Sequence, residues 1–258
     1  MHLATTVTGA QSADPGAHPP LLVAHGLFGS ARNWGAIARR LAHDRQVVTV
    51  DMRNHGDSPR SPEHSYLAMA GDLAETIAAH GGRADMLGHS MGGKAAMMLA
   101  LTEPSLVNRL VVADIAPVEY GHSQMPYVRA MQAVDLSAVN RRSDADAGLA
   151  AHVPEPSLRA FLLQSLAVEE GRARWKLNLE ALAAQMPAIM TFPAVQASFG
   201  GPTLFLTGAR SDYVRPEHWP RIRTLFPAAR HETLAAAGHW LHADAPAAFI
   251  AAVGGFLA

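Results

Sequence analysis

The 258-residue sequence contains no cysteine, which excludes disulfide bonds, thiolate metal sites and cysteine nucleophiles. Charged residues make up only 17% of the chain, and 21 basic against 22 acidic side chains leave a net charge of −1. A nucleic-acid-binding protein needs clustered cationic residues, so this balance predicts no nucleic-acid partner. Disordered chains combine low hydrophobicity with high net charge, whereas 49% of these residues are hydrophobic. The composition therefore predicts a globular protein with a full hydrophobic core.

Long apolar runs are also missing. No stretch approaches the roughly 20 uninterrupted apolar residues of a transmembrane helix. The segment Met1–Pro20 has neither the basic start nor the apolar run of a signal peptide. A chain without cysteine is compatible with a reducing compartment. Together these absences predict a cytoplasmic protein that does not span a membrane.

Short apolar runs alternate along the chain with segments of helical periodicity. The runs have the continuous hydrophobicity of strands buried on both faces, and they are Leu21–Ala24, Val47–Val50, Ala84–Leu87, Leu110–Ala113 and Thr203–Thr207. The helical segments are Trp34–Ala42, Tyr66–His80, Met91–Leu101, Glu217–Phe226 and Ala245–Leu257. This alternation predicts an α/β fold with a mostly parallel, doubly wound sheet.

The interval Pro117–Gly201 interrupts the alternation. It has helix-like stretches at Tyr127–Val134 and Leu158–Leu166 but no convincing buried strand. We therefore expect a core of residues 1–116 and 202–258, with residues 117–201 inserted between two core strands as a helical lid. Open α/β sheets bind ligands beyond the carboxyl ends of their strands, where such a lid would lie.

A nucleophile-elbow pattern, Gly88-x-Ser90-x-Gly92, follows the apolar run ending at Leu87 and opens the helical segment at Met91. The serine of such a sharp strand-to-helix turn has its hydroxyl lifted clear of the sheet. Side chains two residues to either side would collide, which explains the glycines. The helix that begins at Met91 directs free backbone N–H groups at developing negative charge. The pattern predicts Ser90 as a catalytic nucleophile.

Among fourteen histidines, His239 is in the position expected for the base of that serine. It follows the strand-and-turn pattern Thr233–Gly238 and precedes the final helix, in the chain order serine, acid, histidine. An imidazole beside Ser90 could accept its proton and later return it to the leaving group. His242 is the nearest rival, and the Gly-His pair favours His239.

A His-Gly turn, within His25–Gly29, follows the first buried strand and predicts an oxyanion loop. The backbone N–H of Leu27 would act together with that of Met91 on a tetrahedral oxyanion. Phe28 is the second choice for the first of these donors. One such donor typically lowers the reaction barrier by ~3–4 kcal/mol.

Four motifs together resemble those of the α/β-hydrolase superfamily, namely His25–Ser30, Asn33-Trp34, Asp51–Pro59 and Gly88–Gly93. Within the superfamily they resemble the small YbfF-type bacterial esterases and their mitochondrial abhydrolase relatives. The resemblance runs from about Leu21 to the end of the chain and is least distinctive in the insertion. It implies the α/β-hydrolase fold and adds acyl-CoA thioesters as possible substrates.

The resemblance also bears on the acid of the triad. In most α/β-hydrolases the acid follows the strand that here is Thr203–Thr207, but three residues beyond Gly208 stands Ser211, with Asp212 next. The subgroup that the chain resembles has serine at this place and carries its acid after the preceding core strand, at Asp114 here. We therefore favour Asp114 over Asp212, with Ser211 hydrogen-bonded into the same network.

Other polar residues are less easily assigned. Arg53, Asn54 and His55 are interpreted as bracing the turn after the second strand, although a functional role is the alternative. Arg174 and Trp175, near Asn178, could line an acyl pocket or pack the insertion on the core, and the sequence does not separate these roles.

The motifs predict a serine hydrolase of carboxylic esters or thioesters with short to medium acyl chains, acting through an acyl-enzyme. No His-Glu-x-x-His or paired carboxylate–histidine spacing occurs, so we expect neither metal nor cofactor. The same triad could serve a perhydrolase, an acyltransferase or a C–C hydrolase, and a non-catalytic ligand-binding relative is a further alternative. Dehalogenases and epoxide hydrolases are disfavoured because they need a carboxylate where Ser90 stands. The oligomeric state is left open.

Overall fold

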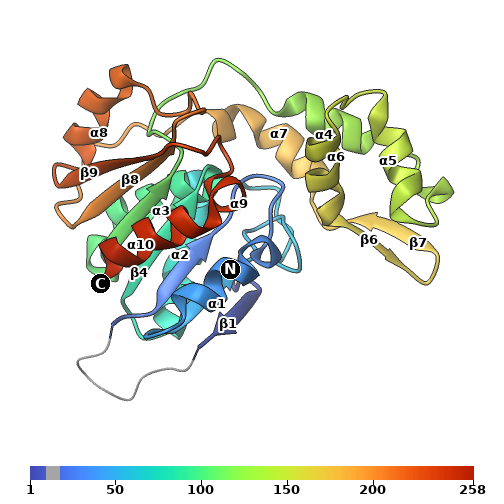
Figure 1. Ribbon diagram of the computed structural model, residues 1–258. Helices are drawn as coiled ribbons and strands as arrows, with labels where there is room; N and C mark the ends of the chain where they lie inside the picture. Colours follow the sequence, from blue (N-terminus) through green and yellow to red (C-terminus); the bar gives the residue numbers. More distant parts are fainter. Residues whose placement is uncertain (10–17) are drawn as a thin grey trace.

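The computed structural model describes residues 1–9 and 18–258, so residues 10–17 of the segment considered above for a signal peptide lie outside it. A seven-stranded sheet runs through the core in the order β1-β3-β2-β4-β5-β8-β9 (Figure 1). All neighbouring strands are parallel except β1, which is antiparallel to β3. The strands are β1 (Thr5–Thr8), β2 (Leu21–Ala24), β3 (Val47–Val50), β4 (Ala84–His89), β5 (Val107–Ala113), β8 (Thr203–Gly208) and β9 (Ala229–Leu234).

Helices cover both faces of the sheet. One face carries α2 (Tyr66–Ala79), α3 (Met91–Thr102) and α8 (Trp219–Leu225), and the other carries α1 (Gly35–Leu41) and α10 (Pro246–Leu257). The short helix α9 (Leu241–Asp244) precedes α10, and 3₁₀ helices cover Ala31–Trp34, Pro104–Leu106, Leu136–Ala138, Leu163–Ser165 and Pro216–His218. This three-layer arrangement confirms the predicted doubly wound sheet.

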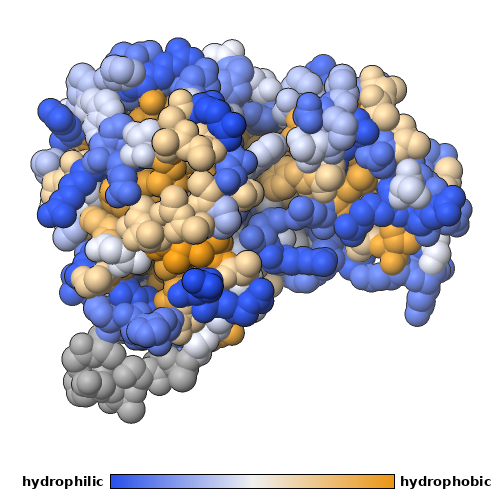
Figure 2. Space-filling view, viewed as in Figure 1, coloured by the Kyte–Doolittle hydropathy of each residue, from blue (hydrophilic) through white to orange (hydrophobic). Residues whose placement is uncertain are grey.

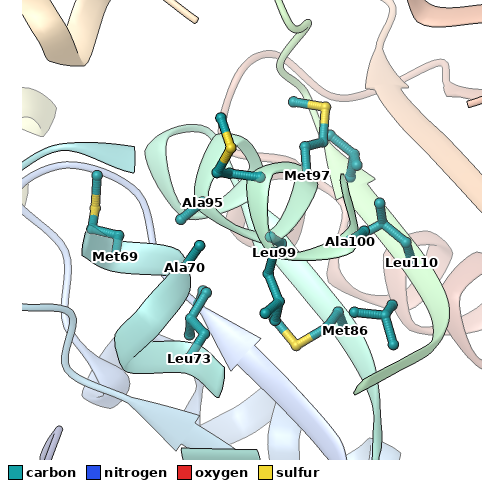
Figure 3. Close-up of a cluster of buried hydrophobic side chains, with 14 of the residues drawn as sticks. Met69, Ala70, Leu73, Met86, Ala95, Met97, Leu99, Ala100 and Leu110 are labelled. Carbon is teal, nitrogen blue, oxygen red and sulfur yellow. The ribbon is translucent and has the colours of Figure 1, made fainter. Parts of the chain in front are cut away.

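Alternate strand residues enter different halves of the core, because successive side chains of a strand point to opposite faces. Leu22 and Met86 pack with the helices of the first face, whereas Leu21 and Leu87 pack with α1 and α10. Figure 3 shows α3 lying close to both the sheet and α2, with methionine and leucine filling the space beside small alanines. The labelled residues are Met69, Ala70 and Leu73 of α2, Ala95, Met97, Leu99 and Ala100 of α3, Met86 of β4 and Leu110 of β5.

Residues 117–201 form a largely helical insertion between β5 and β8, on the right of Figure 1. Its elements are α4 (Met125–Gln132), α5 (Arg142–Ala150), α6 (Pro156–Leu162), α7 (Leu179–Met190) and the hairpin of β6 (Leu166–Glu169) and β7 (Arg172–Trp175). They enclose a hydrophobic cluster of their own, to which the core contributes Phe28.

The insertion contacts the core through the turn that follows β3. Asn178 donates its backbone N–H to Asn54 O at 2.9 Å, and His55 forms an isolated bridge with Leu177. The turn lies at the carboxyl end of a parallel strand, the edge at which open α/β sheets bind ligands. In Figure 2 hydrophobic surface gathers over the α10 side of the core and where the insertion meets the core.

Most predicted elements are confirmed within a few residues. The sequence prediction missed the amino-terminal strand β1, and it missed the hairpin of β6 and β7 because these strands are short and only partly buried. The strand-and-turn pattern Thr233–Gly238 contains the end of β9, which stops at Leu234, and the loop that follows carries His239. In the described residues, no helix is long and apolar enough to cross a membrane.

The start of α3 lies unusually close to the ends of β2 and β4. A Cβ on Gly92 would lie 2.4 Å from Ala24 O and 2.5 Å from His25 O, and a Cβ on Gly88 would lie 2.3 Å from Gly92 O. Real Cβ atoms do not approach backbone oxygens so closely. Glycine at both positions is therefore a condition for this packing.

We expect Gly92→Ala to lower the free energy of unfolding by at least about 2 kcal/mol, because backbone must move to admit the methyl group. Gly254→Ala is the matched control, since Gly254 lies in α10 with nothing within 4 Å of the added Cβ. That change should be neutral or stabilise by up to about 1 kcal/mol, through helix propensity. Urea unfolding of both variants measures the difference, and equal stabilities would contradict the close packing.

Candidate active site

Ser90 lies at the junction of β4 and α3 with φ 52° and ψ −120°, a backbone conformation that residues other than glycine rarely adopt. Its backbone N–H donates to Ala113 O of β5 at 3.0 Å, and its own carbonyl accepts from Lys94 N at 3.0 Å. These bonds hold the turn, and the side chain lines a cavity at the carboxyl edge of the sheet. The geometry is that of the nucleophile elbow predicted from the sequence.

His239 lies in the loop after β9, and its Nδ1 is 2.7 Å from Oδ2 of Asp114. The Tyr213 ring stacks on the imidazole, with ring centroids 3.9 Å apart and an interplanar angle of 18°. His89 Nε2 is bonded to the carbonyl of His239 at 2.8 Å. The ring is therefore fixed by an edge contact with a carboxylate, a face contact with an aromatic ring and an anchored backbone.

Asp114 follows β5, is fully buried and has a positive φ of 52°. Its Oδ2 meets His239 and accepts from the Ser211 hydroxyl, while its Oδ1 accepts from Gly208 N at 3.2 Å. Asp212, in contrast, has a 79% exposed side chain that pairs with Arg215 at 3.1 Å. The structure thus places Asp114, and not Asp212, against the imidazole.

His242, the rival base, has different surroundings. Its ring stacks on Trp34 with centroids 4.2 Å apart, and burial lowers its pKa to about 4. In the described part of the chain its Nδ1 has no hydrogen-bond partner. Without a carboxylate to orient it, His242 lacks the contact that His239 makes with Asp114.

The predicted oxyanion loop follows β2, where Phe28 has a positive φ of 66°. The N–H of Phe28 donates to His55 Nε2 at 3.2 Å and is therefore already used. Leu27, Phe28 and Met91 all line the cavity beside Ser90, so the engaged N–H of Phe28 is what separates the two candidates. This difference favours Leu27 over Phe28 as the donor that acts with Met91.

Buried neutral histidines hold the oxyanion loop in place. His25 Nε2 accepts from Met52 N at 2.9 Å, and His55 Nδ1 is bonded to Arg53 O at 2.9 Å. Burial lowers the pKa of His25 to about 4 and that of His55 to about 3. Burial, with a smaller effect of His55, lowers the pKa of His64 to about 2.

Arg53 and Asn54 make the bracing contacts that we expected from the sequence. The Arg53 guanidinium binds Asp72 of α2 at 2.6 and 2.8 Å. Asn54 Oδ1 accepts from Ser61 N at 2.8 Å and from Asn178 Nδ2 at 3.0 Å. Neither residue is among those that line the cavity.

The two residues of the insertion that the sequence left undecided also lie away from the cavity. Trp175 is buried inside the insertion and donates its indole N–H to Met131 O at 2.9 Å. Arg174 is exposed and lies 3.5 Å from Glu169. Their contacts are those of packing and of surface charge, not of an acyl pocket.

The cavity has a volume of about 260 Å³ and brings Ser90, His239, Leu27 and Met91 together. No hydrogen bond joins Ser90 to His239 within residues 1–9 and 18–258, although both side chains line the same space. The other lining residues are mostly aromatic or aliphatic and include Trp34, Tyr66, Tyr120, Tyr127, Leu158, Phe161, Ile189, Met190 and Trp240.

Sequence reasoning missed several polar residues of this cavity, among them Lys94 and Tyr213. The sequence did contain a signal for Lys94, since it is the one charged residue in the otherwise apolar stretch Met91–Leu101 of α3. The sequence contained no such signal for Tyr213, because only the tertiary structure brings the loop after β8 onto the imidazole of His239. No three metal-ligating side chains converge in the part of the chain that the structure describes. That the reaction needs no metal ion is still a prediction from the sequence.

A family model described as "alpha/beta hydrolase fold" matches residues 19–246. The chain belongs to the α/β-hydrolase family. This confirms the resemblance, and the relatives include the subgroup that the motifs indicated.

Two curated members and one solved structure show the relationship. The chain is 45% identical to "sn-1-specific diacylglycerol lipase ABHD11" of Mus musculus, over 93% of this chain and 81% of the relative. It is 39% identical to "Esterase YbfF" of Escherichia coli, over 92% of each. A solved "Marine microorganism esterase" superposes with a TM-score of 0.93 at 36% identity, covering 99% of both chains.

The buried histidines predict a pH-dependent stability. Their folded pKa values lie below the ordinary 6.5, so unfolding takes up protons as the pH falls below that value. Each such group lowers the free energy of unfolding by about 1.4 kcal/mol per pH unit, until its folded pKa is reached. The free energy of unfolding should therefore be highest above pH 6.5 and fall steeply towards pH 4.

Urea unfolding at pH 7, 6 and 5 tests this expectation. The variant His55→Gln keeps an acceptor for Phe28 N. Because it lacks one buried imidazole, its free energy of unfolding should fall less steeply with decreasing pH, by the contribution of one proton. A wild-type stability that does not change between pH 7 and pH 5 would contradict the burial of neutral imidazoles.

Proposed function

We propose that this chain is a serine hydrolase that cleaves carboxylic esters, and that Ser90, His239 and Asp114 are its catalytic triad. The observation that carries the proposal is that the strained elbow of Ser90 and an imidazole bonded to a buried carboxylate line the same cavity. The names of the curated relatives, an esterase and a diacylglycerol lipase, support ester cleavage.

In the proposed mechanism His239 removes the proton from Ser90 as Oγ attacks the ester carbonyl. Asp114 holds the Nδ1–H tautomer and stabilises the imidazolium that forms. The N–H groups of Leu27 and Met91 donate to the oxyanion, and His239 then protonates the departing alkoxide. Water activated by the same imidazole hydrolyses the acyl-enzyme and regenerates Ser90.

The cavity lining supports an apolar acyl group of short to medium length. Aromatic and aliphatic side chains surround Ser90, and the insertion supplies several of them, among them Tyr127, Leu158 and Phe161. Burial of apolar surface is the contact through which such walls hold an acyl chain. Thioesters, including acyl-CoA, react by the same steps and are included in the proposal.

We also propose that residues 117–201 act as a lid domain over a core of residues 1–116 and 202–258. The separate hydrophobic cluster of the insertion and its contribution to the cavity support this division.

We also propose a cytoplasmic location, because a chain without cysteine suits a reducing compartment.

Hydrolysis of p-nitrophenyl butyrate at neutral pH, with a chelator present, is the first test. The wild type should turn over, and Ser90→Ala should lower kcat by about 10⁴-fold or more, because no other nucleophile stands at the elbow. Activity that survives in Ser90→Ala, or that the chelator abolishes, would contradict the mechanism. Acyl transfer to an added alcohol or to peroxide would instead identify an acyltransferase or a perhydrolase with the same triad.

The assignment of the acid is tested by a matched pair of variants. Asp114→Asn should lower kcat by about 10⁴-fold, because an amide cannot hold the reactive tautomer of His239. Asp212→Asn removes only an exposed ion pair and should leave kcat within about threefold of the wild type. The reverse ranking of the two variants would move the acid to Asp212.

A further inference from the structure

Lys94 is a buried cation that the proposed mechanism does not use. Its side chain lies one helical turn beyond Ser90 on α3, is 1% exposed and lines the active-site cavity. No carboxylate in the described chain lies within ion-pair distance of its ammonium group. Burying an unpaired charge is costly, so the contacts that compensate it indicate what the residue does.

The ammonium group donates to three backbone carbonyls at the base of the insertion. Its Nζ lies 2.9 Å from Val118 O, 3.3 Å from Met190 O and 2.6 Å from Thr191 O. Val118 belongs to the leading segment (residues 114–124), which runs from β5 into the insertion. Met190 and Thr191 belong to the returning segment (residues 188–202), where α7 ends and the chain goes back to β8.

Neighbouring contacts hold the same two segments to each other and to the core. Tyr120 N donates to Met190 O at 3.0 Å, and the Tyr66 hydroxyl of α2 donates to Ile189 O at 2.6 Å. The rings of Tyr66 and Tyr120 lie 5.6 and 4.7 Å from the Lys94 ammonium, within reach of a cation–π interaction. Both segments are thus attached to α3 through the Lys94 ammonium, and the returning segment is also attached to α2 through Tyr66.

The joined segments also form a wall of the cavity. Tyr120 of the leading segment and Ile189 and Met190 of the returning segment line it, as does the oxyanion loop. Their positions relative to Ser90 depend on how the two segments are held. A contact that fixes both segments to α3 therefore fixes the size of the acyl space.

We propose that Lys94 is a positioning residue, whose ammonium group joins the leading and returning segments and so sets the acyl-binding wall beside Ser90. The inference rests on the ester hydrolysis proposed above. It assigns Lys94 no contact with the reacting atoms, so its removal should raise KM for the acyl group more than it lowers kcat.

The protonation state of Lys94 adds a measurable consequence. Burial lowers its pKa to about 7, opposed by the nearby exposed Glu119, and the other titratable groups that face it are Tyr66 and Tyr120. An ammonium has three N–H donors for the three carbonyls, whereas the neutral amine has two. Lys94 should therefore bind all three carbonyls below neutral pH, and its hydrogen bonds to the two segments should weaken above neutral pH.

The chain has only two lysines, Lys94 and Lys176, which supplies a matched control. Lys176 also joins the insertion to the core, through a surface ion pair with Asp57 at 2.8 Å, but it is not a cavity residue. We would compare Lys94→Met with Lys176→Met, and use Lys94→Gln as a second variant if Lys94→Met does not fold. Circular dichroism and Tm establish that each variant is folded.

Amide hydrogen exchange provides a test that needs no turnover. Lys94→Met should speed exchange at residues 116–120 and 188–192 together by about tenfold, because it leaves Val118 O and Thr191 O without a donor and removes one of the two donors to Met190 O. Lys176→Met should leave both segments unchanged. Wild-type exchange in a folded Lys94→Met or Lys94→Gln variant overturns the proposal, whether or not the protein hydrolyses esters.

Kinetics with p-nitrophenyl butyrate test the effect on the cavity. Lys94→Met should raise KM about tenfold and change kcat by less than about threefold, the pattern of lost ground-state binding. The wild-type KM should rise between pH 7 and pH 9, and that of Lys94→Met should not. Equal KM profiles in the two proteins would overturn the positioning role. Absence of turnover by the wild type would instead count against the proposed function, while the exchange result still decides on Lys94.

Discussion

The close approach of α3 to the ends of β2 and β4 is the constraint on which the site depends. Glycines at 88 and 92 allow backbone to meet backbone, and Ser90 between them is held with a positive φ of 52°. The same approach brings the N–H of Met91 beside the oxyanion loop and places Lys94 beneath the insertion. One packing contact thus determines where the nucleophile, a proposed oxyanion donor and a buried cation lie.

Around this contact the protein buries polar groups and gives them partners. Neutral imidazoles accept backbone N–H groups of the oxyanion loop and of the turn after β3, and Arg53 pairs with Asp72. Buried polar groups without partners would cost several kcal/mol each, so these bonds specify one arrangement of the loops. On the core side these bonds hold the loops around the cavity, and the remaining wall comes from an insertion that is attached at its base.

Local pattern was enough to predict most of the core. Buried parallel strands are continuous apolar runs, and the elbow is a short motif whose glycines have a steric cause, so Leu21–Ala24 and Ser90 could be identified directly. β1 was missed because its exposed residues give no apolar run. Asp114 was selected only through a family resemblance, since a carboxylate after a strand has no pattern that marks its distant histidine partner.

The sequence by itself determined the fold class, the family and the serine at the elbow, because these depend on residues that are close together in the chain. Only the tertiary structure decided which carboxylate meets His239, which N–H of the oxyanion loop is already bonded, and which carbonyls the Lys94 ammonium contacts. These three contacts join residues 125, 27 and 97 positions apart. Their geometry is set by the packing of whole elements, which no local pattern encodes.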